Sequence, residues 1–506
     1  MGRTLSRERT SHSSITVEGL VDHGRYLHRG FFETVTDADR EAVERGTHEE
    51  LLAGDGLYAN LWGVQTGEID DLPETFVDTV THGTIDGDRS LLGQPKNRSV
   101  YYVLGGPKSM GREKPARGES TRRAFVAYGS TAIGSGLLAG CSDIVNQNES
   151  ESTTETDDGS YTATLAPVGT VTLETPPTSV FTHFPWFPDM TTALGRGESV
   201  NYLWWDGTAA ALEYFTAGMD GVEIAWRDEP GAYGFTKEQL YELDSDLHLV
   251  DPAWVTTQDN WTRADVDEIA TNVGPWFGNY YSSNHATPPE EWADGYEYNT
   301  LWELFDGVAS LYGERSRYEA FAAVHDDLLE TIEDRLPPES ERPTVAYLSL
   351  ETDLSAIHVL PLNAPGYWNT HTRPLGAVDA FGEQEFDGPF IEVDSEALLE
   401  SDPDVILALW TVTETVDFEQ LVRNLRDDPV ASELTAVQND RVYVQGTRWQ
   451  GPLMNLFQLE MTAKQLYPEQ FGTWPGYEDG DVYPAFGPDE RLFDHQRVAD
   501  IITGEF

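Results

Sequence analysis

The feature that most constrains the fold is a long amphipathic run over residues 300–336. Thr300 and Glu303 form a capping-box pattern, which opens a helix. Apolar residues then recur at helical spacing until Pro337 ends the run. The pattern predicts one helix, or two nearly collinear helices broken near Gly313, of about 50 Å at 1.5 Å per residue. A rod of this length is either a large core helix or a spine that joins two lobes.

Short strand and helix patterns alternate on both sides of this run, which predicts an α/β fold of two α/β lobes joined by a long helix, with a ligand cleft between them. The continuously apolar segment 405–410 is typical of a parallel strand covered on both faces. The predicted strands are 169–173, 180–182, 200–204, 247–250, 344–350, 357–360, 390–393, 405–410 and 441–444. The predicted helices include 189–194, one that begins at Thr236, 395–399 and 453–466. The predicted boundaries are 161–298 for the N-terminal lobe, 299–338 for the spine helix and 339–506 for the C-terminal lobe.

The charge balance restricts the environment and the partners. The chain carries 88 acidic against 32 basic residues and a formal net charge of −56. Such an excess repels itself in dilute solution and is screened by concentrated salt, which predicts a halophilic, haloarchaeal type of protein. The 14 Trp, 22 Tyr and 21 Phe residues argue against a disordered acidic chain. Nucleic acid is excluded as a partner because no basic stripe is present.

An export signal with a lipid-attachment site is predicted in front of the folded part. Arg122 and Arg123 precede an apolar run that ends at Cys141, the one cysteine of the chain. The run is too short and too rich in Gly and Ser to span a membrane. We interpret residues 110–140 as a twin-arginine lipoprotein signal and residues 141–160 as a disordered acidic tether. The prediction is a cell-surface protein, exported by the twin-arginine route and lipid-anchored at Cys141 to the outer face of the cytoplasmic membrane.

Residues 1–109 fit poorly before an export signal, and Met110 is a plausible start. We interpret them as a non-native or remnant extension. Segments 23–32 and 43–61 resemble pieces of ABC transporter ATPase domains. No G-x-x-x-x-G-K-[ST] phosphate loop occurs in the chain, so no ATPase activity is expected.

The part after Cys141 resembles the substrate-binding lipoproteins of ABC importers, in the helical-spine class that binds iron–siderophore complexes, haem and cobalamin. Three passages carry this resemblance: 174–180 with 193–195, 240–250, and 395–409 with 434–443. The resemblance implies a protein that binds without chemistry, captures a ferric siderophore or similar iron complex between two lobes, and delivers it to a membrane permease. It implies no enzyme activity, no cofactor and no resident metal.

Candidate ligand contacts lie in loops at the strand ends, which in this architecture face the cleft. Aromatic side chains provide stiff contact area, and arginine neutralises carboxylate or catecholate oxygens. For any single aromatic, ordinary core packing is the competing interpretation. The candidates are His183, Trp186, Phe187, Trp254, Tyr367, Trp368, His371, Arg373, Trp410, Arg448 and Trp449.

Other functions remain open. A lipid-anchored enzyme is one, although the histidines are scattered and join no H-E-x-x-H or G-x-S-x-G motif. An adhesion protein is another, and it would lack an enclosed aromatic cleft. Among ligands, a Tyr or His facing a planar slot would favour haem, whereas Trp walls without arginine would favour cobalamin.

Overall fold

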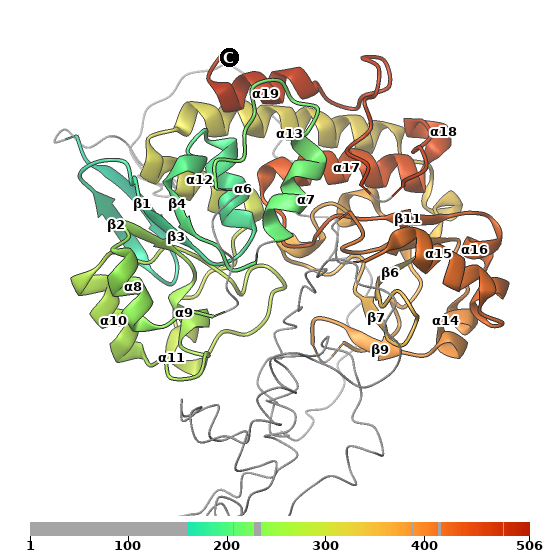
Figure 1. Cartoon of the computed structure of the whole chain (residues 1–506), viewed down its shortest axis with the longest axis horizontal. Helices are drawn as coiled ribbons and strands as arrows, with labels where there is room; N and C mark the ends of the chain where they lie inside the picture. Colours follow the sequence, from blue (N-terminus) through green and yellow to red (C-terminus); the bar gives the residue numbers. More distant parts are fainter. Residues whose placement is uncertain (1–158, 206, 227–233, 387, 413–415, 479) are drawn as a thin grey trace, which may run out of the picture.

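The computed structural model describes residues 159–205, 207–226, 234–386, 388–412, 416–478 and 480–506. They form two α/β lobes side by side, with helices running across both (Figure 1). Twin-arginine residues Arg122 and Arg123, the predicted lipid site Cys141 and the extension 1–109 lie outside the described residues. The mixed α/β class predicted from the sequence is confirmed.

The N-terminal lobe is built on a three-stranded parallel sheet of order β4-β3-β5. Its strands coincide closely with three predicted ones, and a β1-β2 hairpin stands beside the sheet. The strands are β1 (Tyr161–Leu165), β2 (Gly169–Leu173), β3 (Val180–Thr182), β4 (Val200–Tyr202) and β5 (Leu247–Leu249). The helices are α6 (Trp186–Ala193), η2 (Gly197–Ser199), α7 (Gly207–Thr216), α8 (Lys237–Leu243), α9 (Pro252–Val255), α10 (Arg263–Asn272) and α11 (Glu290–Ala293).

The C-terminal lobe contains a larger mixed sheet of order β11-β10-β6-β7-β9, with β8 paired to β6. β6, β10 and β11 are parallel, so their carboxyl ends meet at one edge. The strands are β6 (Thr344–Leu350), β7 (Ile357–Leu360), β8 (Val378–Asp379), β9 (Ile391–Val393), β10 (Val405–Ala408) and β11 (Val442–Val444). The helices are η3 (Glu339–Glu341), η4 (Tyr367–Asn369), η5 (Arg373–Leu375), α14 (Ser395–Ser401), α15 (Phe418–Asp427), η6 (Ala431–Glu433) and α16 (Thr435–Gln438).

The predicted spine is two helices that fold back on each other, so the prediction of a single or nearly collinear rod is wrong. α12 (Leu301–Tyr312) begins at the predicted capping box and ends at Gly313, which has φ +68°. α13 (Arg315–Arg335) then returns along it. The Trp302 ring stacks on the His325 ring at 4.2 Å between centroids, which requires an antiparallel pair. Gly313, in the left-handed conformation, reverses the chain at the point where the sequence pattern predicted a break.

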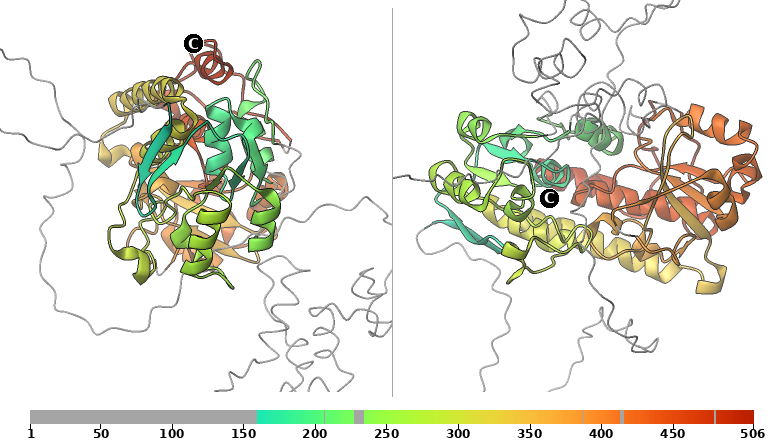
Figure 2. Two further views of the ribbon diagram at one scale, coloured as in Figure 1. Left: turned by 90° about the vertical axis from the view of Figure 1, so that its left-hand side faces the viewer. Right: turned by 90° about the horizontal axis from the view of Figure 1, so that it is seen from below.

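Two helices run across the lobes together. α13 and α17 (Pro452–Leu466) extend from one lobe to the other in Figure 2, where they are the long yellow and red helices. All of α17 is buried. The chain then continues through α18 (Pro468–Phe471) to α19 (His495–Thr503), which packs against α13 and α6. The C-terminal segment therefore returns to the N-terminal lobe.

Candidate functional site at the interface of the lobes

The N-terminal lobe places its predicted site residues at the carboxyl ends of β3 and β5. His183 directly follows β3, and Trp254 follows β5. Their rings lie 4.5 Å apart between centroids because the two strands are parallel neighbours. Trp186 and Phe187 were expected in a loop, but they form the first turn of α6, and Trp254 lies in α9.

The local reason for the helix at Trp186 is its proline pattern. Pro185 is the residue before the helix and Pro188 lies in its first turn. Proline lacks an N–H and has a fixed φ, and both properties suit the start of a helix. The prolines that suggested a loop are therefore compatible with a helix N-terminus.

Asp251 fixes a second segment of this lobe, which contains a site residue that sequence reasoning missed. Its carboxylate accepts hydrogen bonds from the Ala253 amide at 2.8 Å, the Tyr280 amide at 2.7 Å and the Tyr296 hydroxyl at 2.6 Å. The Tyr280 ring thereby stacks on Phe184 with centroids 5.0 Å apart. The available signal was the adjacent Tyr280-Tyr281 pair in a polar loop.

The C-terminal lobe contributes residues after β10, after β11 and in η4. Trp410 follows β10 and has φ +69°, a strained conformation for a bulky side chain. Its ring lies 4.4 Å from that of Trp449, which follows β11. Tyr367 and Trp368 form the turn η4. Strain of this kind is characteristic of functional positions.

The site residues of the N-terminal lobe contact those of the C-terminal lobe, and their aromatic rings form one cluster across the interface. The centroid distances are 5.4 Å for Trp186–Tyr367, 6.1 Å for Tyr280–Trp368 and 4.6 Å for Trp204–Trp449. We call this set the interface cluster: His183, Phe184, Trp186, Trp204, Trp254, Tyr280, Tyr367, Trp368, Trp410, Arg448 and Trp449. Every member is buried.

Backbone contacts hold the two sides together. The Tyr367 hydroxyl donates to the carbonyl of Asn279 at 3.1 Å, and the Trp368 amide donates to the carbonyl of Ser283 at 2.9 Å. Gly366 has φ +98°, and a Cβ there would lie 2.4 Å from the Ser283 carbonyl oxygen. The two lobes are therefore in direct contact, and the cluster residues contact one another across the interface.

Arg448 is the charged member of the interface cluster. Its guanidinium lies over the Trp368 ring at 4.2 Å from the centroid, and Nη1 donates to the carbonyl of Pro389 at 3.0 Å. Within the part of the chain that the structure describes, its Nε has no hydrogen-bond partner. Burial lowers the pKa of Arg448 to about 10, and the groups that raise this pKa are the phenols of Tyr347 and Tyr280 rather than a carboxylate. A buried cation without an anionic partner is costly, so this position suits an anionic ligand.

The remaining predicted polar residues have different surroundings. Neither ring nitrogen of His183 has a hydrogen-bond partner among the described residues, and burial holds its pKa well below the usual value. His371 is hydrogen-bonded through both ring nitrogens, to Tyr347 and Gln450. Arg373 is exposed, and its Nη1 donates to the carbonyls of Ala364 at 2.7 Å and Gly366 at 2.8 Å. Phe187 is buried beside Trp186.

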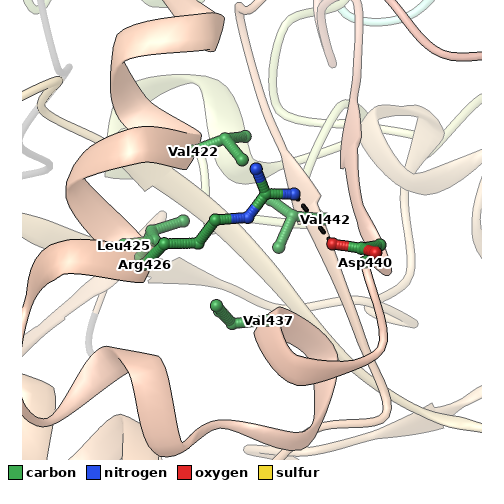
Figure 3. A pocket seen from close by; sticks show the side chains of 6 residues that line it. All are labelled: Val422, Leu425, Arg426, Val437, Asp440 and Val442. Atoms are coloured by element: carbon green, nitrogen blue, oxygen red, sulfur yellow. Dashed lines mark hydrogen bonds and ion pairs between the residues drawn. The ribbon is translucent and has the colours of Figure 1, made fainter.

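A small cavity lies elsewhere, between α15, α16 and β11 (Figure 3). Its volume of about 30 Å³ leaves room for water molecules only. Arg426 at its wall is ion-paired with Asp440 at 2.8 Å. The cavity is too small for an iron chelate, and the charge of the arginine that lines it is already neutralised by Asp440.

Two features are absent from the described ranges. No group of three His, Cys, Asp or Glu side chains there is arranged to hold a metal ion. No helix in that part of the chain is long and apolar enough to cross a membrane.

Comparison with known proteins gives one family match and a set of similar structures. Residues 235–448 match the family model described as "Periplasmic binding protein". No curated protein matches.

Three of the similar structures are a periplasmic binding protein from Veillonella parvula, the iron-uptake substrate-binding protein PiuA from Streptococcus pneumoniae and the petrobactin-binding protein YclQ from Bacillus subtilis. The first has 13% identity and a TM-score of 0.45, over 61% of this chain and 91% of that one. PiuA has 15% identity and a TM-score of 0.44, over 60% and 98%. YclQ has 13% identity and a TM-score of 0.43, over 61% and 97%.

Proposed function

We propose that this chain is the extracytoplasmic solute-binding component of an ABC importer, which captures a ferric siderophore or a similar iron complex and delivers it to a membrane permease. The family match over residues 235–448 supports a solute-binding role. The proposed contacts are the predicted residues of the interface cluster together with Tyr280. The protein acts by binding and carries out no chemistry.

The observation that carries the proposal is Arg448. In a chain of net charge −56, a buried arginine that has no carboxylate partner among the described residues sits on an aromatic face at the junction of the lobes. Ferric catecholate and carboxylate chelates present anionic oxygens, which guanidinium binds with charge-assisted hydrogen bonds. The aromatic rings of catecholates also match the tryptophans around Arg448.

Tryptophan fluorescence titration of the mature chain in high salt tests this function. Ferric siderophores, haemin and cobalamin are titrated in turn, and quenching by an anionic ferric siderophore is expected. The Arg448→Met variant should bind it about ten- to hundredfold more weakly, because a charge-assisted hydrogen bond contributes about 1.5–3 kcal/mol. Arg426→Met, which removes a surface ion-paired arginine far from the cluster, is the matched control and should bind normally. If none of the three ligands changes the tryptophan fluorescence of the unchanged protein, the proposal is refuted.

Haem is a second candidate because His183 is buried and neither of its ring nitrogens is hydrogen-bonded to a described residue. Neutral imidazole is a common axial ligand of haem iron. A Soret shift on addition of haemin that disappears in His183→Ala would favour haem over a siderophore. Cobalamin is less favoured, since Arg448 places a charge among the tryptophans.

The location of the protein is part of the proposal. Export through Arg122 and Arg123 and lipid attachment at Cys141 would hold the binding domain beside its permease. The mature chain is expected to begin at Cys141 with a mass increase from the lipid. Cys141→Ser should release the protein from membranes, and a peptide upstream of Met110 in purified precursor would contradict the interpretation of residues 1–109 as a non-native extension.

A further inference from the structure

A chain of buried hydrogen bonds runs from α17 through Gln450 and His371 to Tyr347. Gln450 Nε2 lies 2.6 Å from His371 Nδ1, and His371 Nε2 lies 3.3 Å from the Tyr347 hydroxyl. Tyr347 is on β6 and is one of the two phenols that act on the pKa of Arg448. The donor and the acceptor in each of these hydrogen bonds determine whether the Tyr347 hydroxyl can donate its proton to a ligand.

The amide orientation of Gln450 follows from its neighbours. Gln458 Nε2 donates to the carbonyl of Thr447 at 2.9 Å, and a carbonyl can only accept. The same Nε2 lies 2.9 Å from Gln450 Oε1, which also accepts from Asn455 Nδ2 at 3.1 Å. The oxygen of the Gln450 amide therefore faces α17, and its NH₂ group faces His371.

The tautomer of His371 follows in turn. Its ring is fully buried, and burial lowers its pKa to about 3, so the imidazole is neutral. Nδ1 accepts from Gln450, so the single ring proton is on Nε2 and is donated to the Tyr347 oxygen. The Tyr347 hydroxyl proton thus remains available for a different acceptor. Arg448 lies over the ring of Trp368, whose backbone carbonyl accepts from Gln450 Nε2 at 3.5 Å. Its guanidinium offers only donors, and its Nε has no partner among the described residues.

We propose that Tyr347 is a specificity-determining hydrogen-bond donor of the interface site, and that His371 and Gln450 are positioning residues that keep its proton available for a ligand oxygen beside Arg448. The proposal rests on the proposed function and narrows it. The favoured ligand presents an anionic oxygen, as catecholates and carboxylates do, which accepts from both the phenol and the guanidinium. In this arrangement His371 acts through Tyr347 rather than on the ligand.

The Gln450→Glu variant tests the direction of these bonds without changing the shape of the side chain. The new carboxylate can still accept from Asn455 and Gln458, but it cannot donate to His371. The ring proton then moves to Nδ1, and Nε2 accepts a hydrogen bond from the Tyr347 hydroxyl, which keeps its proton. Affinity for an anionic ferric tris-catecholate should fall about ten- to hundredfold, as expected for a lost hydrogen bond to a charged group. Affinity for an uncharged ferric tris-hydroxamate should change less.

A double-mutant cycle separates this effect from repulsion by the added charge. Tyr347→Phe should weaken tris-catecholate binding by a similar factor, and the double variant should bind no more weakly than Tyr347→Phe alone. Additive losses, or a single variant with normal affinity, would overturn the proposal. Thermal unfolding of each variant verifies that it is folded.

A nuclear magnetic resonance experiment on histidine-labelled protein examines the relay without any ligand. The His371 nitrogens should show the Nε2–H tautomer from pH 5 to pH 8 in the unchanged protein and the Nδ1–H form in Gln450→Glu. An Nδ1–H ring in the unchanged protein, or titration near neutral pH, would overturn the relay. Failure of the proposed function is distinguishable, because the unchanged protein would then bind no ferric chelate at all.

Discussion

At the scale of single residues, Asp189 shows how one carboxylate joins distant parts of the chain. Its oxygens accept hydrogen bonds from the backbone amides of Gly451 at 3.1 Å, Leu453 at 2.9 Å and Met454 at 2.9 Å. These are amides at the N-terminus of α17, so Asp189 of α6 acts as the cap of a helix in another part of the sequence. A Cβ on Gly451 would lie 2.4 Å from the Asp189 carboxyl carbon, which explains the glycine.

Asp189 should give the protein a measurable pH dependence. Burial raises its pKa from 3.8 to about 7, against the lowering effect of the three amides. The folded state therefore holds the proton more tightly than the unfolded state. The contribution of Asp189 to the unfolding free energy is fully present below about pH 4 and is lost as the pH rises through 7. The unfolding free energy of the unchanged protein minus that of Asp189→Asn should fall on the order of 4 kcal/mol over this range.

Denaturant unfolding at constant high salt, at several pH values from 4 to 8, measures this difference. The asparagine variant shares every other carboxylate with the unchanged protein, so their titration cancels in the subtraction. A difference that stays constant across the range would show that Asp189 does not titrate as proposed.

At the scale of elements, the hairpin of α12 and α13 depends on the reversal at Gly313. A Cβ at this position would lie 2.5 Å from the Tyr161 ring, and its φ of +68° disfavours any other side chain. Gly313→Ala should therefore destabilise the protein by about 2–3 kcal/mol, from backbone strain and overpacking together. Gly218→Ala is the matched control, because a Cβ there meets nothing within 4 Å. Equal melting temperatures for the two variants would contradict this account of the turn.

The elements also show what the sequence can predict. The strands β2, β3, β6, β7 and β10 and the helix α17 lie where periodicity placed them, because each buries an apolar pattern. The angle between α12 and α13 could not be predicted from the sequence, because Gly313 is compatible with both a break in the helix and a reversal of the chain direction. Trp186 was misplaced because proline marks helix starts as well as loops.

The candidate site was less predictable than the strands. Strand ends indicated most members of the interface cluster, yet Tyr280 is positioned by Asp251 through contacts that sequence spacing does not reveal. The link between Asp189 and α17 spans more than 260 residues of chain. The roles of the predicted site residues remain proposals, and the relay through Gln450 emerged only from the geometry.

At the scale of the whole molecule, stability should depend strongly on salt. The net charge of −56 produces self-repulsion that ions screen within about 3 Å at 1 M salt. The melting temperature of the mature chain is expected to rise steeply with KCl concentration before it levels off. Scanning calorimetry over a KCl series measures this, with sucrose as an uncharged additive for comparison. An unchanged melting temperature in dilute buffer would refute the halophilic interpretation.

The path of the final segment determines how this molecule can be assembled and divided. Arg317 of α13 donates to the carbonyls of Ile501 and Ile502 in α19, and the Tyr483 amide donates to the carbonyl of Tyr214 in α7. Glu460 in α17 accepts from the Tyr483 hydroxyl at 2.7 Å. Contacts with the C-terminal end of the chain therefore complete the N-terminal lobe. Contacts between residues that are far apart in sequence slow folding. A chain truncated near residue 450 would lack the segment that covers part of the N-terminal lobe. Expression of the two lobes as separate chains would therefore not yield two autonomous domains.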